Sequence, residues 1–600
     1  MEHSDRQNRG IKDMKRLALF SFYSQSGAVR SFIYYYLERL AGLSDVVFIV
    51  NGSLQPASKA DLEKKGFRVF CRENTGFDFG AWKEFLVSED HAFFSQYDEL
   101  ILCNCSCYGP VYPFEEIFSQ MDGRECDFWG LYRHHGLKDS KHHIPPHLQS
   151  YFLVIRNKLF HNKCFREYFS KLNYADTWND AVNQETSFTR YFENNGFVSS
   201  SFLGSVFSEY IENPTIFMPA KLLALKFPLV KRKCFTTDYR YINKISSAAQ
   251  INDVLSFIRN NTDYPVDLIY EDLLWSAENS HLIKALGLSY VLDSGDESGP
   301  AASGEERGKI AAVLLSSRAD RVADSIRYLS SLPDGASVFV MVTSEELKNA
   351  WSSQLSLLSQ YKVEIRLVGN GMPVTAGCLL HCSDALRSFD FVCLLNDLGD
   401  AQSDPPVKDR FFAEHCLSAL LFSKEYVRNI IGLFRKNYRL GLLMPFVPMF
   451  AEWPDRILNE EWGGCRETAL RIYSRLNLTV PFDEHPVAPW GGMFWLRGRA
   501  MEALYRHGWT GADSEPAVEK EKGESTLSDA LLRMSPMIAQ ESGFFSGCVC
   551  PSELAGCQLS NMYFSLEKYS NVKLSHDGVH FSDVKKILRL YLRRKLLGIK

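Results

Sequence analysis

The sequence predicts an α/β protein with two mostly parallel sheets, each covered by helices on both faces. Buried-strand candidates alternate with helical spacing from residue 16 onward, which is the order that builds a parallel sheet. The alternation stops at 293–308, a stretch rich in Gly, Ser, Glu and Asp that is typical of a linker, and then restarts. A chain of 600 residues is also too long for one hydrophobic core, so two or more domains are expected.

The first domain is predicted over residues 16–245, after a disordered N-terminus at 1–15. Short apolar runs predict its strands, and apolar residues at helical spacing predict its helices. The predicted strands are 16–23, 45–50, 67–71, 97–103, 127–131 and 149–155. The predicted helices are 29–40, 57–65, one that opens within 72–83, and 178–197.

The second domain is predicted at 309–580, after a helical connector at 246–292 and the linker. Its predicted strands are 309–316, 337–343, 363–368, 389–395 and 491–496, with helices at 319–332 and 525–539. The two halves correspond loosely, because 97–102 parallels 389–394, 149–160 parallels 491–500, and the segment from Glu185 to Phe197 parallels that from Glu524 to Phe544. The sequence therefore predicts a divergent duplication of one α/β unit.

Composition excludes several classes of protein. The chain is 46% hydrophobic and 23% charged, as globular proteins are, and its net charge of −5 argues against a nucleic-acid partner. Fifteen cysteines without a paired framework, and an N-terminus without an apolar region, predict a reducing cytoplasm. No apolar run is long enough to span a bilayer; the closest, 440–450, is short, holds two prolines and is predicted as a buried strand and loop.

Polar side chains follow the first four predicted strands. In mostly parallel sheets, ligands bind beyond the carboxyl ends of the strands, so these side chains are expected to meet at one edge. They are Tyr23, Asn51, Asn74, Asp78, Asn104 and Ser106. The convergence of six positions predicts a binding site more strongly than any single motif.

The most informative stretch is Arg72-Glu-Asn-Thr-Gly-Phe-Asp-Phe-Gly-Ala-Trp-Lys83, which joins the third predicted strand to a helix. A Gly-containing turn in this place lets backbone N–H groups approach a diphosphate closely. Asn-x-Gly is also a common tight turn that needs no ligand. The local pattern leaves both interpretations open.

This stretch, together with 102–110, 127–130, 147–152 and 227–233, resembles the rhamnan synthesis protein F family. In the second half the clearest similarity is Gly491-Gly-Met-Phe-Trp495. The family is linked to rhamnose-rich cell-surface polysaccharides, including O-antigen-type chains of lipopolysaccharide, and is similar to GT-A glycosyltransferases. The resemblance implies two GT-A-like domains. It also implies transfer of rhamnose or a related sugar from a nucleoside diphosphate, with dTDP-L-rhamnose the suspected donor, to a glycan or lipid-linked glycan.

The resemblance also implies roles for single residues. The donor is assigned to Tyr23, Asn51, Asn74, Gly76, Asn104 and Ser106. Glu185 and Asp78 are the catalytic candidates: Glu185 heads a later helix and would take the proton of the acceptor hydroxyl, and Asp78 lies on the nucleotide side. For Glu185 the alternative is a surface carboxylate near a helix N-terminus, where the helix dipole favours acids.

Three further residues, His147, Gln149 and Trp129, are candidates for contact with the sugar or acceptor. The alternatives are structural. A histidine at this place can cap a turn, and a tryptophan is more often a core side chain than a stacking platform.

The metal site is the point at which the chain departs from the family, which usually has Asn-Asp-Ser where this chain has Asn104-Cys105-Ser106. Because Mg²⁺ prefers carboxylate oxygens, the change weakens a hard-cation site, and Mg²⁺ or Mn²⁺ stays only an open alternative. Cys103, Cys105 and Cys107 could face one way and hold a soft metal, although buried free cysteines are the simpler interpretation.

The second domain and the C-terminus leave alternatives open. Asp397, Asp400 and Glu524 are candidates for a second catalytic site, against a plain Asp- and Gly-rich turn. Eroded motifs also allow a degenerate fold that binds glycans or scaffolds an assembly complex. Residues 581–600 have the pattern of a basic amphipathic helix, which predicts either binding to the inner face of the bacterial plasma membrane or docking on its own domain.

Overall fold

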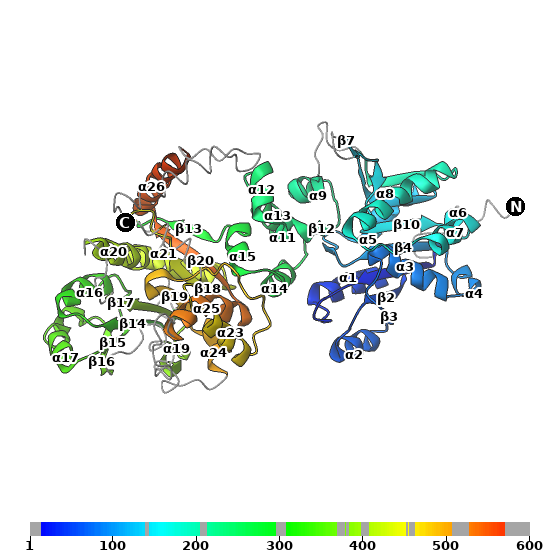
Figure 1. Ribbon diagram of the computed structural model, residues 1–600. Helices are drawn as coiled ribbons and strands as arrows, with labels where there is room; N and C mark the ends of the chain where they lie inside the picture. Colours follow the sequence, from blue (N-terminus) through cyan, green and yellow to red (C-terminus); the bar gives the residue numbers. More distant parts are fainter. Residues whose placement is uncertain are drawn as a thin grey trace, which may run out of the picture. The chain divides into compact units, whose positions relative to one another are not determined.

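The computed structural model describes residues 14–138, 143–204, 213–295, 308–368, 379, 383–397, 407–451, 454, 462–506 and 527–570. The chain divides into two compact units, Met1–Leu273 and Leu274–Lys600, each described here by itself (Figure 1). Residues 1–13 of the N-terminus predicted at 1–15, most of the linker, and the C-terminal helix at 581–600 lie outside the described residues.

The first unit is built on a mixed sheet whose strand order is β11-β6-β10-β4-β1-β2-β3, with β9 added beside β6. The strands on this path are β1 (Arg16–Phe22), β2 (Asp45–Asn51), β3 (Arg68–Arg72), β4 (Glu99–Asn104), β6 (Phe128–His134), β10 (Phe152–Arg156) and β11 (Ser199–Leu203). Only β10 runs antiparallel to its neighbours on this path. Every residue of β1 and β4 is buried, as expected for central strands that helices cover on both sides.

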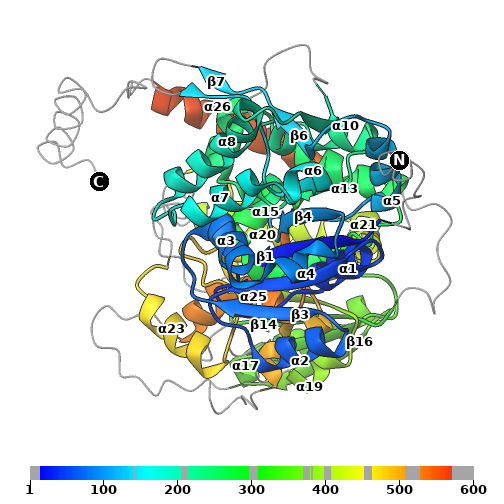
Figure 2. The ribbon, with the colours of Figure 1, turned by 90° about the vertical axis from the view of Figure 1, so that its right-hand side faces the viewer.

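Two layers of helices cover this sheet (Figure 2). On one face, α1 (Ser31–Ala41) and α5 (Phe114–Asp122) pack together through Tyr36 and Phe114. On the other, α3 (Phe77–Ser88), α7 (Lys163–Lys171) and α8 (Trp178–Asn194) share one apolar cluster with β1, β2 and β4. The remaining elements are α2 (Pro56–Lys64), α4 (His91–Ser95), α6 (Asn157–Phe160), α9 (Pro214–Phe217), α10 (Pro219–Ala224), α11 (Lys233–Thr236), α12 (Tyr239–Ile245), α13 (Gln250–Asn261), α14 (Asp267–Ser276), β5 (Cys107–Tyr108), β7 (Leu137–Lys138), β8 (His143–Ile144), β9 (His147–Leu148) and β12 (Val230–Lys231).

The second unit repeats the topology of the first. Its sheet has the order β13-β20-β18-β19-β17-β14-β15-β16, and only β19 is antiparallel to its neighbours. The strands are β13 (Ser289–Leu292), β14 (Ile310–Ser316), β15 (Ser337–Val342), β16 (Lys362–Leu367), β17 (Phe391–Asn396), β18 (Leu440–Pro445), β19 (Phe494–Arg497) and β20 (Phe545–Pro551). Apart from the added β13, each strand has a counterpart at the same place in the first sheet. The predicted fold class, an α/β protein with two mostly parallel sheets, is thereby confirmed, and an origin of the two domains by duplication stays a prediction.

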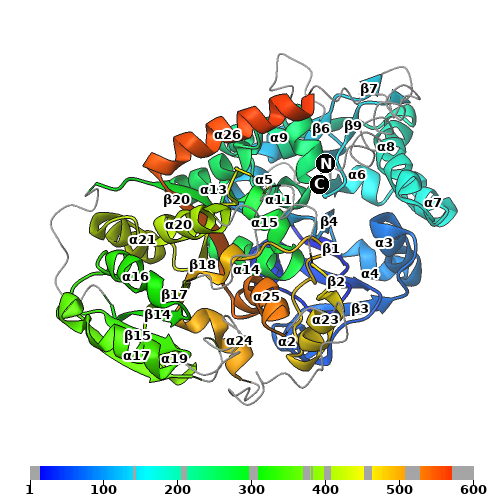
Figure 3. The same ribbon diagram turned by 60° about the vertical axis from the view of Figure 1, so that its left-hand side comes forward.

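Alternate residues of β14 face two different cores. One core contains α16 (Val322–Leu329), α17 (Glu345–Ser352), α20 (Val407–Leu421) and α21 (Lys424–Lys436), and the first two of these lie beside β14 to β16 in Figure 3. The other contains α23 (Arg466–Arg475), α24 (Glu502–Tyr505) and α25 (Leu527–Glu541). The remaining helices are α15 (Asn279–Ala285), α19 (Ser383–Arg387), α26 (Ser552–Ser570) and the 3-10 turns η2 (Ala319–Arg321), η3 (Leu355–Leu358), η4 (Trp490–Gly492) and η5 (Gly498–Met501). Within the described residues, no helix is both long and apolar enough to cross a bilayer.

Asp483 is a buried carboxyl that ties α15 to the rest of the second unit. It accepts hydrogen bonds from Ser280 N at 2.9 Å, Ser280 Oγ at 2.8 Å and His485 N at 3.2 Å. Burial raises its pKa to about 6, an effect that Glu278 reinforces and the bonds from Ser280 and His485 oppose. The folded state therefore binds a proton more tightly than the unfolded state does, and stability falls as pH rises from about 4 to above 6.

Replacing Asp483 with Asn is expected to remove this dependence. The wild type should lose roughly 2–3 kcal/mol of unfolding free energy between pH 4 and pH 7.5 relative to D483N, since one pKa unit is worth about 1.4 kcal/mol. Calorimetry of both proteins across this range measures the difference. Asp320, whose side chain is 64% exposed, supplies the control, and D320N should leave the profile nearly unchanged. Parallel profiles for D483N and the wild type would contradict the assignment.

Candidate active site

A continuous chain of hydrogen bonds links the carboxyl ends of β1, β2, β3 and β4. Ser21 Oγ donates to Asp78 Oδ1 at 2.7 Å, and Asn51 Nδ2 donates to Ser21 Oγ at 3.1 Å. Arg72 Nη1 donates to Asn51 Oδ1, and Asn104 Nδ2 donates to Asp78 Oδ2 at 2.7 Å. The structure thus brings together three of the predicted residues, Asn51, Asp78 and Asn104, around the carboxylate of Asp78.

Arg72 also fixes the turn that opens α3. Its guanidinium donates to Thr75 O at 2.9 Å and Thr75 Oγ1 at 3.1 Å, and it pairs with Glu84 at 2.7 Å. Gly76 takes a left-handed conformation with φ of 70°, which glycine adopts without steric cost. The ring of Tyr174 lies so close that a Cβ atom at Gly76 would come within 2.4 Å of it. The turn is therefore specified by a buried cation and a close approach, as well as by the Asn-x-Gly pattern.

The electrostatics of Asp78 place two more charged groups at this edge. Burial raises the pKa of Asp78, the bonds from Ser21 and Asn104 and the charge of Lys231 lower it, and the charge of Glu185 raises it. The contacts agree with these effects. Lys231 Nζ lies 3.3 Å from Ser106 Oγ, which bonds to Asn104, and 4.2 Å from the centroid of the Tyr151 ring. Ser150, the neighbour of Tyr151, bonds to Glu185, so both charged groups lie at the strand-end cluster.

Glu185 is held by the connection between β9 and β10. Its Oε1 atom accepts hydrogen bonds from Ser150 N at 2.6 Å and Ser150 Oγ at 2.8 Å. Helix α8 begins at Trp178, as predicted, with Thr177 and Asp180 forming the cap, so Glu185 does not head the helix as the resemblance implied. Glu185 lies two turns further in, so the helix dipole does not explain an acid there. One oxygen is fixed by Ser150, and neither of these bonds involves Oε2.

Several predicted donor contacts lie at the rim of the cluster. Tyr23 is 52% exposed just after β1, and Asn74 is exposed beside Gly52. Ser106 donates from N and Oγ to Asn104 Oδ1, at 3.1 and 2.6 Å, and so continues the chain of bonds beyond β4. Side chains at these positions are able to contact a ligand that binds beyond the strand ends.

The burial and contacts of the three acceptor candidates show which of them have structural roles. Trp129 is 1% exposed and packs against Phe118 with 5.2 Å between ring centroids, so no surface is left for stacking on a sugar. His147 is buried, stacks on His134 and lies 2.8 Å from Pro145 O through Nδ1. Gln149 is partly exposed, but its Oε1 is buried without a hydrogen-bond partner among the described residues. Core and turn roles are favoured for the first two.

The donor set after β4 does not fit a divalent cation. Asp78 is the carboxylate bonded to this turn, and each of its oxygens already accepts a hydrogen bond. Mg²⁺ needs about six oxygen ligands in near-octahedral order. Among the described residues no three His, Cys, Asp or Glu side chains are grouped to hold a metal. The soft-metal alternative also lacks support, because Cys103 and Cys105 direct their Sγ atoms to different backbone carbonyls, of Leu19 and Tyr23.

The sequence did not single out Ser21, Ser150 or Lys231. Ser21 was visible only as part of a buried strand, and Ser150 only as a neighbour of Gln149. Lys231 was one of several cations between 226 and 233. Its position depends on the pairing of β12 with β5, in which Lys231 lies opposite Cys107. A pairing between strands more than a hundred residues apart cannot be predicted from a local sequence pattern.

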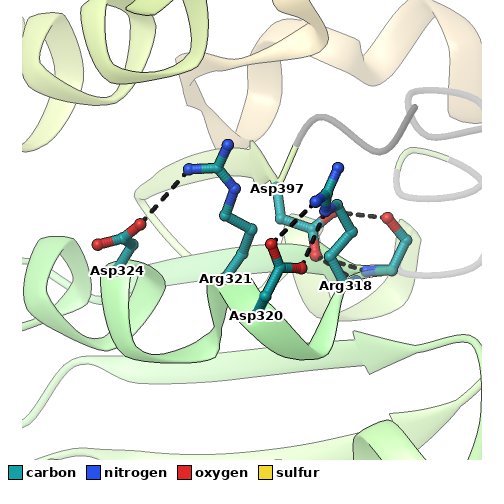
Figure 4. Close-up of polar contacts among 6 residues, drawn as sticks. Arg318, Asp320, Arg321, Asp324 and Asp397 are labelled. Carbon is teal, nitrogen blue, oxygen red and sulfur yellow. Dashed lines mark hydrogen bonds and ion pairs between the residues drawn. The ribbon is translucent and has the colours of Figure 1, made fainter. Parts of the chain in front are cut away.

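In the second unit Asp397 occupies the place that corresponds to Cys105, directly after the fourth strand. Its carboxylate accepts bonds from Ser316 Oγ at 3.2 Å, Ser317 N and Oγ at 2.6 Å each, and Arg318 N at 2.8 Å. Figure 4 shows it turned toward this segment, with Arg318 paired to Asp320. Asp397 anchors the turn after β14, which favours the structural alternative. Asp400 and Glu524 lie outside the described residues.

Comparison with solved structures gives distant likenesses. The glycosyltransferase GlyE of Streptococcus pneumoniae TIGR4 is 10% identical, with 70% of this chain and 99% of that chain covered and a TM-score of 0.24. S. aureus TarS 1-349 is 14% identical, with 46% and 79% covered and a TM-score of 0.23. The 4-diphosphocytidyl-2C-methyl-D-erythritol synthase of Anaerococcus prevotii DSM 20548 is 14% identical, with 36% and 100% covered and a TM-score of 0.23. These low values support no conclusion about activity.

Sequence comparison is more decisive. No curated protein matches the chain. The family model of rhamnan synthesis protein F matches residues 46–544, which include most strands of both sheets, without β1 and β20, and most of the strand-end cluster. The chain therefore belongs to the rhamnan synthesis protein F family.

Proposed function

We propose that the first unit is a glycosyltransferase that moves rhamnose or a related deoxysugar from a nucleoside diphosphate to a glycan of a cell-surface polysaccharide. The observation that carries the proposal is the convergence of Glu185, Lys231 and the Asp78 cluster at the carboxyl edge of the first sheet, through contacts of Ser150, Tyr151, Ser106 and Asn104. Family membership supports a role in polysaccharide synthesis. A cytoplasmic site of action, at the inner face of the plasma membrane, belongs to the same proposal.

Glu185 is assigned as the general base. Ser150 holds Oε1, and Oε2 is the atom that takes the proton of the acceptor hydroxyl. The acceptor oxygen forms a bond to the anomeric carbon while the bond from that carbon to the diphosphate oxygen breaks. The nucleoside diphosphate leaves with the electron pair, through an oxocarbenium-like transition state.

The strand-end cluster is assigned to the donor. Asn51, held between Ser21 and Arg72, and the exposed Tyr23 are assigned to the nucleotide, and the exposed Asn74 is assigned to the diphosphate side. Backbone N–H groups of the turn around Gly76 approach the diphosphate, because left-handed glycine leaves the backbone uncovered.

Calorimetric titration tests the proposal. The folded chain should bind one nucleoside diphosphate sugar among dTDP-L-rhamnose, UDP-sugars and GDP-sugars, and release the matching nucleoside diphosphate when a glycan acceptor is added. No binding to any of these donors would overturn the proposal.

A second candidate function is a glycan-binding or scaffolding subunit that keeps the fold without the chemistry. Cys105 in place of an acid, and Asp397 committed to a turn, favour it. Binding of the polysaccharide without binding of any donor, in the same titration, would select this function over sugar transfer.

A further inference from the structure

The turn after β4 is paired with a second segment of the first unit. Strand β12 runs antiparallel to β5, with Lys231 opposite Cys107 and Val230 opposite Tyr108. Arg232 N adds a bond to Ser106 O at 2.9 Å. The pairing holds the backbone of Lys231 beside the turn that, in the resemblance described above, carries the cation-binding acid.

The ammonium group of Lys231 is held in place by uncharged groups. Its Nζ atom lies 3.3 Å from Ser106 Oγ and 4.2 Å from the centroid of the Tyr151 ring. Among the residues that the structure describes, no carboxylate forms an ion pair with it. The neighbouring Arg232 differs, because it forms an ion pair with the buried Asp272 at 2.9 Å. A cation held by a hydroxyl and a ring face keeps its charge available for an anion.

A second ammonium belongs to the exposed Lys233. Its Nζ atom is 4.1 Å from the centroid of the Trp178 ring, and that ring lies 6.5 Å from the ring of Phe77, the first residue of α3. Desolvation and the charge of Lys231 lower the pKa of Lys233, whereas Glu185 raises it. Two like charges at one edge of a sheet repel each other, and a polyanion bound between them relieves this repulsion.

We propose that the Lys231 ammonium, supported by Lys233, binds the diphosphate of the donor in place of a divalent cation. The inference rests on the proposed function and identifies the group that neutralises the charge of the diphosphate. Two independent observations support it. The oxygen ligands described after β4 do not fit a divalent cation. The ammonium of Lys231 contacts Ser106 of that same turn and forms no ion pair with a described carboxylate. Cys105 is then tolerated because no acid is needed there.

The test measures dTDP, UDP and GDP binding by calorimetry in Mg²⁺ and again in EDTA. The wild type should bind its nucleotide with a dissociation constant that changes less than about twofold in EDTA. K231M keeps the apolar stem over Tyr151 and removes the charge. It should weaken binding on the order of 10- to 100-fold in both buffers, as expected for loss of a charge-assisted bond to phosphate. K231R should recover most of the affinity.

Lys226 provides the matched control. It lies in the same basic segment with its Nζ atom 4.4 Å from the centroid of the Tyr112 ring, and K226M should bind the nucleotide as the wild type does. Loss of wild-type binding in EDTA, or K231M binding as tightly as the wild type, would overturn the inference while leaving donor binding intact. Failure of the folded wild type to bind any of the three nucleotides would overturn the inference and the proposed function together.

Discussion

Replacing Glu185 with Gln should lower the rate constant of sugar transfer by about 10²- to 10⁴-fold, the usual contribution of a general base. The amide oxygen of Gln can still accept the bonds from Ser150, so the connection between β9 and β10 keeps its anchor. The donor dissociation constant should therefore change less than about twofold. Initial rates at saturating donor, with calorimetry of donor binding, measure the two quantities separately.

Glu193, on the same helix, is the control for this variant. It pairs with Arg133 at 2.9 Å and accepts a bond from Ser199, which ties α8 to β6 and β11. E193Q should keep transfer within about twofold of the wild type. Full transfer activity in E185Q would place the base elsewhere, and a large loss in both variants would indicate a structural effect on α8.

The sequence predicted the central strands well because their residues are apolar on both faces and need no partner to be recognised. Strand β11 was missed because three of its five residues are serines, so its identity depends on pairing with β6. Strand β20 contains Gly, Ser and two cysteines and ends at a proline, so its local sequence pattern does not predict a buried strand. In both cases the tertiary contact, and not propensity, decides the structure.

The candidate site shows the same division. Asn51, Asp78 and Asn104 could be predicted because Asn51 and Asn104 end β2 and β4, Asp78 follows β3 at the start of α3, and strand ends meet at one edge. Ser150 and Lys231 could not, because each reaches the site from a different segment of the first unit. The aromatic candidate Trp129 packs against Phe118 in the core, and no sequence motif encodes this contact.

Replacing Gly76 with Ala should destabilise the first unit by about 2–4 kcal/mol. Roughly 1 kcal/mol comes from the left-handed φ of 70°. A further 1–3 kcal/mol or so comes from overpacking, since the new Cβ would lie 2.4 Å from Tyr174 Cδ1 and 3.2 Å from Gly80 Cα. To avoid the methyl group, the Tyr174 ring would have to leave its contacts with Arg72 and Lys83, which lie 5.7 and 5.0 Å from its centroid. Denaturant unfolding measures the loss.

Gly66 separates the two contributions, since its φ of 85° is also left-handed but no heavy atom lies within 4 Å of a Cβ built there. G66A should cost only about 1 kcal/mol. Combining G76A with Y174A should recover most of the excess, because the double variant removes the atom that the methyl group meets, and the coupling energy of this cycle measures the clash directly. Equal losses in G66A and G76A would show that the turn relaxes around the methyl group. The close packing of Tyr174 on the Asn74-Thr-Gly76 turn would then play no part in holding the donor-binding edge in shape.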